Sequence, residues 1–120
     1  MIKVGFFGLA GPDWMNAISL PEVQLEYFDY VEKGREFAQI LRSEQHGCDL
    51  VIALTHMRAP DDRILASQVH EIDLILGGHD HSYLTEVDAS TGVVLIKSGS
   101  DFEAFNDFSL FFDCSDADYT

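Results

Sequence analysis

The stretch Asp73-Leu-Ile-Leu-Gly-Gly-His-Asp-His81 decides how the rest of the chain is interpreted. Its aliphatic run, residues 72–76, predicts a buried strand. The two glycines that follow allow the backbone to turn sharply and to approach other groups closely. His79 and His81 come directly after the glycines. Because a strand provides a rigid base, two imidazoles at this spacing can converge on one point, as metal ligands do.

A second stretch, Asp49-Leu-Val-Ile-Ala-Leu-Thr-His56, has the same plan of an aliphatic run that ends in a histidine. Two parallel strands in one sheet would place His56 beside His79 and His81, at the sheet edge where open α/β folds carry their sites. The three histidines together therefore predict a metal site. For any single one, the alternative is a strand-end histidine that bonds only to backbone.

Hydrophobic periodicity predicts an α/β fold with a mixed sheet. A parallel β-α-β-α-β core is followed by an antiparallel hairpin and a final strand. Asp88-Ala-Ser-Thr-Gly92 has turn chemistry suited to the hairpin loop. The predicted strands are 2–9, 49–54, 72–76, 83–87, 93–97 and 105–112, and the predicted helices are 30–44 and 60–70.

With these flanking strands and in this order, Leu-Thr-His56 and Gly-Gly-His79-Asp-His81 resemble the later half of a calcineurin-like metallophosphoesterase domain. The opening residues 2–9 and the stretch 94–101 are similar to the 5′-nucleotidase branch of that superfamily. The resemblance implies that residues 1–112 are the C-terminal part of such a domain, half of an αββα sandwich. Residues 113–120 would form an acidic tail.

The resemblance also implies a chemistry. Metallophosphoesterases hold two divalent ions, such as Zn, Mn or Fe, and hydrolyse phosphate esters, here of nucleotides or related small molecules. By position, His56 and His79 resemble ligands of one ion and His81 resembles a ligand of the other. Asp62 is a candidate for orienting His56, with a simple acidic residue in the first turn of a helix as the alternative. Asp80 is expected to form the turn rather than to bind a metal.

The family's Asp-x-His, Gly-Asp and Gly-Asn-His motifs do not occur in this sequence. We therefore expect a fragment with no complete catalytic set, at most one bound ion and weak or no activity alone. Half a sandwich exposes a sheet edge and an apolar face, which predicts a homo-oligomer or association with a missing N-terminal half. One alternative is a non-catalytic interaction or metal-binding module derived from the fold. Another is a small α/β regulatory domain with structural histidines.

Composition narrows the class of partner. The 120 residues carry a formal net charge of -14, which argues against binding to a nucleic-acid backbone or an anionic membrane surface. An anionic phosphate ester suits such a protein only if bound cations reverse the local field. No apolar run approaches the ~20 residues of a membrane span, and the opening residues lack the pattern of a secretory signal. These features predict a cytoplasmic protein.

Overall fold

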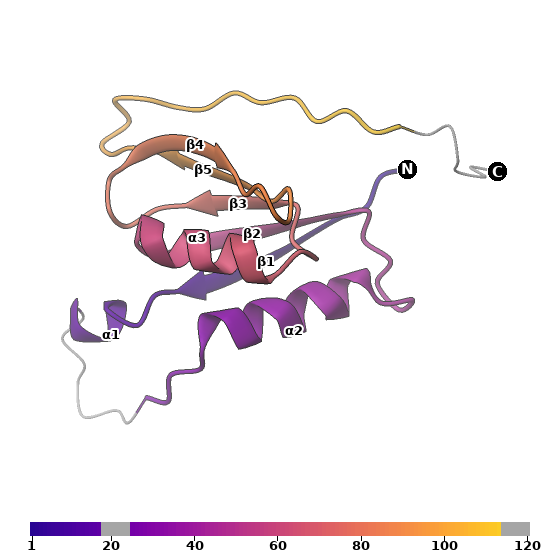
Figure 1. The fold of residues 1–120 in the computed structure, drawn as a ribbon, viewed down its shortest axis with the longest axis horizontal. Helices are drawn as coiled ribbons and strands as arrows, with labels where there is room; N and C mark the ends of the chain where they lie inside the picture. Colours follow the sequence, from indigo (N-terminus) through magenta and orange to yellow (C-terminus); the bar gives the residue numbers. More distant parts are fainter. Residues whose placement is uncertain (18–24, 114–120) are drawn as a thin grey trace.

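The computed structural model describes residues 1–17 and 25–113. The predicted acidic tail lies outside this part of the chain, apart from its first residue. Eight elements occur in it, as Figure 1 shows. In chain order they are β1 (Val4–Ala10), α1 (Trp14–Ala17), α2 (Tyr30–Arg42), β2 (Leu50–His56), α3 (Ala59–Gln68), β3 (Leu74–Gly77), β4 (Tyr83–Val87) and β5 (Val94–Ser98).

The strands form one mixed sheet in the order β1-β2-β3-β5-β4. Strands β1, β2, β3 and β5 run parallel to one another, and β4 pairs antiparallel with β5 at the edge of the sheet. The predicted α/β class, the parallel β-α-β-α-β core and the hairpin are thus confirmed. The architecture is consistent with half of an αββα sandwich.

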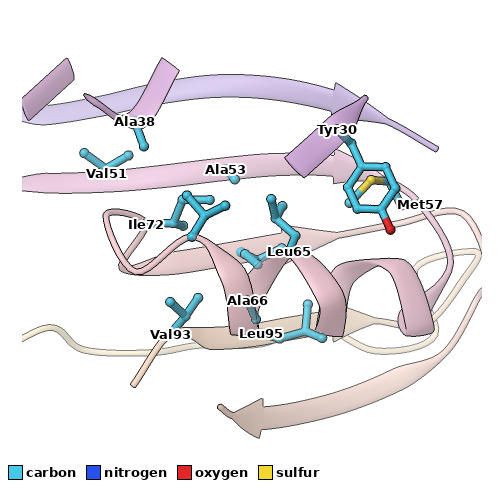
Figure 2. Close-up of a cluster of buried hydrophobic side chains, with 12 residues drawn as sticks. Tyr30, Ala38, Val51, Ala53, Met57, Leu65, Ala66, Ile72, Val93 and Leu95 are labelled. Carbon is cyan, nitrogen blue, oxygen red and sulfur yellow. The ribbon is translucent and has the colours of Figure 1, made fainter. Parts of the chain in front are cut away.

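The sheet has two unlike faces, because alternate strand residues point to opposite sides. On one face, Val51, Ala53, Ile75 and Leu95 pack with residues of α2 and α3 in the larger core cluster. Figure 2 shows Leu65 and Ala66 of α3 within this cluster, together with Val51, Ala53 and Leu95 from the strands. The other face carries a second cluster made of strand residues, and these are Leu50, Ile52, Leu74 and Ile96. Both helices in contact with the sheet therefore cover the same face.

Helix α2 begins with Asp29 as its N-cap residue. The side chain of Asp29 accepts hydrogen bonds from the backbone N–H groups of Val31 (2.9 Å) and Glu32 (3.0 Å). These two donors have no partner inside the helix, so the carboxylate stabilises the helix start. At the other end, the helix ends at Arg42, two residues before the predicted end at residue 44. Ser43 caps it, and Gly47 lies in the following turn with φ 55°.

The predicted last strand at 105–112 is wrong, since residues 104–113 have no regular secondary structure in the described chain. The alternation there specifies an extended chain, but a strand also needs a neighbour to pair with. The segment, orange to yellow in Figure 1, is tied back through its Asn106 amide, which donates to the Ser98 hydroxyl at 2.8 Å. Phe105 and Phe111 stay 83% and 94% exposed.

The described residues contain no helix with the length and apolar character needed to cross a lipid bilayer.

Candidate metal-binding site

The parallel register places two of the three predicted histidines in contact. His56 is the last residue of β2, and His79 follows β3 after a single residue, Gly78. Atoms Nε2 of His56 and Nδ1 of His79 are 3.0 Å apart, and the ring centroids are 4.8 Å apart. His79 lies in the left-handed region of backbone conformation, with φ 78°. Such a conformation costs free energy for a residue with a side chain. Here it is part of the turn that orients the His79 side chain toward His56.

Asp13 completes this pair from the loop after β1. Its Oδ2 lies 3.0 Å from Nε2 of His79 and accepts a hydrogen bond from Nε of Arg58 at 2.7 Å. Desolvation raises the pKa of Asp13, but the hydrogen bonds from Arg58 and His79 outweigh it and hold the pKa below its usual value. A carboxylate in this place favours the tautomer of His79 that carries its proton on Nε2. Nδ1 of His79 is then free to accept.

Trp14 covers the pair. Its ring centroid is 4.4 Å from that of His56 and 6.2 Å from that of His79, where the rings meet edge to face. The short helix α1 positions this side chain directly after Asp13. The histidine pair therefore lies against an aromatic wall on one side, which limits the directions from which a ligand can approach.

His81 stands apart from the pair. Its side chain is exposed, its φ is 54°, and in the described part of the chain it forms no hydrogen bond or ion pair. Among residues 1–17 and 25–113 there is no group of three histidine, cysteine or acidic side chains placed to hold one metal ion. The structure thus brings together His56 and His79, and leaves His81 outside their contact.

Asp62 and Asp80, the aspartates considered in the sequence analysis, contact groups other than the histidine rings. Asp62 is fully buried and accepts a hydrogen bond from the Thr55 hydroxyl at 2.6 Å. The sequence leaves open two roles for Asp62, orienting His56 or serving as an acidic residue in the first turn of a helix. Burial raises the pKa of Asp62, and the contacts of Lys97 and Thr55 oppose the rise. Asp80 shapes the turn, as expected, through an ion pair with Lys97 at 2.8 Å.

The pair fits one part of a metal site. Two imidazole nitrogens that each bind an ion at ~2.0–2.1 Å are roughly 2.8–3.4 Å apart in tetrahedral or octahedral geometry. The observed 3.0 Å between His56 Nε2 and His79 Nδ1 lies in this range. A ligating histidine commonly donates its other N–H to a carboxylate, and Asp13 offers one. A cation bound by both nitrogens would replace the single proton that they share.

Sequence reasoning missed Asp13 and Lys97. The position of Asp13, just after a strand in the same parallel sheet, was a usable signal, because the carboxyl ends of parallel strands lie at one edge. Lys97 gave a weaker signal. It ends the run Val-Val-Leu-Ile-Lys97, and a strand-end lysine is usually exposed.

No family model matches the chain. Over 91 residues it is 35% identical to an apyrase from Tabanus yao, a match that covers 75% of this chain and 16% of the apyrase. It is 33% identical over 86 residues to the trifunctional nucleotide phosphoesterase protein YfkN from Bacillus subtilis, covering 72% of this chain and 6% of that protein. A snake venom 5′-nucleotidase from Gloydius brevicauda is 31% identical over 103 residues, which are 80% of this chain and 17% of that protein. The chain spans less than a fifth of the length of these relatives.

Proposed function

We propose that this chain, which belongs with the 5′-nucleotidase-like phosphoesterases, contributes a divalent-metal half-site to the hydrolysis of phosphate esters. The single observation that carries the proposal is the pair formed by His56 Nε2 and His79 Nδ1, 3.0 Å apart, with Asp13 against the outer nitrogen of His79. Two neutral imidazoles suit Zn, Mn or Fe ions. The relatives' names support a nucleotide or a related phosphate ester as substrate.

When bound, a divalent ion supplies charge neutralisation of the phosphate and an activated water. The residues of this chain at this edge of the sheet bind the ion, orient its ligands and shield them. His56 and His79 hold the ion, Asp13 keeps the proton of His79 on Nε2, and Trp14 shields one side of the pair. His81, exposed on the same turn, is the candidate ligand for a second ion or for the substrate.

The chain alone is proposed to be weakly active or inactive. It lacks the Asp-x-His, Gly-Asp and Gly-Asn-His motifs, and a two-metal clamp needs a bridging carboxylate between its ions. We propose that a missing N-terminal half, or a second copy of the chain, packs on the sheet face that α2 and α3 leave free. Leu54 and Phe6 on the strands are 46% and 56% exposed, as expected of a sheet face whose packing partner is absent.

A non-catalytic module is the second candidate. It is favoured by the fact that the described residues bring no third ligand to the pair. In that reading the chain binds a partner with one ion or none.

The test is the metal content of the purified chain, measured by plasma mass spectrometry after dialysis against zinc or manganese. We expect about one ion per chain, lost in His79→Ala and retained in His70→Ala. His70 is the matched control because its side chain is 76% exposed and lies outside the pair. An ion that survives His79→Ala, or none in any of the proteins, would contradict the half-site.

Hydrolysis of bis(p-nitrophenyl) phosphate separates the two candidates. The half-site proposal expects no turnover from the chain alone, and turnover that depends on His79 once an N-terminal half carrying the three missing motifs is added. A complemented protein that binds metal and stays inactive would favour the non-catalytic module.

A further inference from the structure

Lys97 is the most unusual charged residue of the described chain. It lies on β5 with a side chain only 1% exposed. Its Nζ forms ion pairs with Asp62 Oδ2 and Asp80 Oδ1, each at 2.8 Å, and donates to two backbone carbonyls at 2.7 Å. An ammonium has three N–H donors, so four acceptors saturate it. A buried charge with such partners is expensive to remove, because its neighbours are left unpaired.

The two carbonyls belong to the histidine turns. One is that of Met57, the residue after His56, and the other is that of Gly78, the residue before His79. The ammonium thus joins the backbone of the two turns at the points where the ligand side chains leave the sheet.

Asp80 extends the same cluster. While Oδ1 binds Lys97, Oδ2 accepts a hydrogen bond from the backbone N–H of Ala59 at 2.6 Å. Ala59 is the first residue of α3, and the cap residue Arg58 makes no side-chain cap bond. Asp80 therefore caps α3 from a distant loop. It also sits between two left-handed residues, His79 and His81, so its contacts hold the strained part of the turn.

The register explains how a lysine reaches this place. Thr55, Gly77 and Lys97 lie side by side on β2, β3 and β5. Each lies two residues after a core residue of the same strand, Ala53, Ile75 or Leu95, and therefore on the same helix-covered face of the sheet. Asp62 of α3 contacts this end of the sheet through the Thr55 hydroxyl. Gly77 provides the room, since a Cβ there would be 2.9 Å from Cε of Lys97.

From this arrangement we infer that Lys97 is a positioning residue for the histidine pair. With Asp62 and Asp80 it fixes the backbone of both turns, so that Nε2 of His56 and Nδ1 of His79 face one another before any ion binds. Only the reason for holding the histidines in place, metal binding, rests on the proposed function. The positioning itself concerns the metal-free chain and can be measured there.

The experiment compares metal-free wild type with two variants. Lys97→Met combined with Asp62→Asn removes the ammonium and the charge buried against it. Val93→Ala is the matched control, because it removes core volume near the opposite end of β5 and lowers stability without touching the turns. Thermal unfolding measures the stability of both variants, and the comparison is made under solution conditions in which their stabilities are equal. A difference at the turns then does not come from a general loss of stability.

Two readouts then test positioning. We expect a nuclear Overhauser effect between the ring protons of His56 and His79 in wild type and in Val93→Ala, since the ring centroids are 4.8 Å apart. In the Lys97 variant we expect this effect to vanish and amide exchange at residues 78–80 to rise at least tenfold. An effect that persists in the Lys97 variant, or that is lost equally in Val93→Ala, would overturn the inference.

Zinc titration completes the design, with at least tenfold weaker binding expected in the Lys97 variant. If wild type binds no zinc, the proposed metal function fails, and the two metal-free readouts still decide the role of Lys97. Should the Lys97 variant fail to fold, Asp80→Asn replaces it. That substitution weakens the contacts of Asp80 to Lys97 and Ala59 and should increase exchange at residues 78–80, whereas unchanged exchange would overturn the inference.

Discussion

Gly77→Ala is the most direct test of the packing at the end of β3. An ideal Cβ at this position would lie 2.9 Å from Cε of Lys97 and 3.0 Å from Oδ2 of Asp62. A flexible lysine could usually move away. Here its ammonium is held by four acceptors and its side chain is 1% exposed, so the alanine has no room unless the cluster shifts.

Two opposing effects set the magnitude. Alanine restricts the unfolded chain more than glycine does, which stabilises the fold by about 0.5–1 kcal/mol when the site accepts it. Overpacking a filled site costs about 1–3 kcal/mol. The second effect should win, with a net loss of about 1 kcal/mol in the free energy of unfolding. For a domain of this size that corresponds to roughly 3–6 °C in the melting temperature.

Gly8→Ala is the matched control, because it is the same substitution on a strand of the same sheet. Among the described residues, a Cβ at Gly8 would find only the carbonyl oxygen of Leu54, 3.9 Å away. This variant should therefore be as stable as wild type or more stable by about 0.5–1 kcal/mol. Thermal and urea unfolding followed by circular dichroism measure both. If Gly77→Ala proves as stable as Gly8→Ala, the side chain of Lys97 is not held where the structure places it.

The other predictions concern titration and association. Burial raises the pKa of Tyr30 to about 12, so the chain should lose stability as the pH rises from about 10 toward 12, and Tyr30→Phe should reduce that loss in alkaline unfolding curves. Hydrogen bonds from Ser90 and Thr91 hold the pKa of Asp88 below its ordinary value of 3.8. The stability that it adds should be full above that value and disappear as the pH falls through the lowered pKa. The stability gap between wild type and Asp88→Ala should close over that range, and a gap that is constant with pH would contradict this. Finally, sedimentation should show concentration-dependent self-association that Leu54→Glu weakens, and a monodisperse monomer would argue against an unfinished sheet face.

Much of the fold could be predicted because local patterns and tertiary structure agree. The hairpin is the clearest case. Asp88 accepts hydrogen bonds within the turn, and Gly92 adopts φ 78°, as the turn chemistry indicates. The predicted strand at 105–112 failed for a non-local reason. Its alternation is genuine, but pairing depends on a neighbouring strand that no local pattern can supply.

The site divides in the same way. Contact between His56 and His79 could be predicted, because each ends or follows a strand and parallel strands bring such residues to one edge. The separation of His81 could not, because it depends on the left-handed backbone at His79 and His81. Asp13 and Lys97 come from other elements, and only the sheet register brings them to the pair.

The sequence by itself determined the α/β class, the kinship with nucleotide phosphoesterases and the edge of the sheet that carries the histidines. Periodicity and short motifs encode these properties locally. Only the tertiary structure decided which histidine nitrogens face each other, which carboxylate orients them and why a lysine is buried beneath them. The physical reason is that burial and hydrogen-bond partners are set by strand order and register, which join residues up to 66 positions apart in the chain.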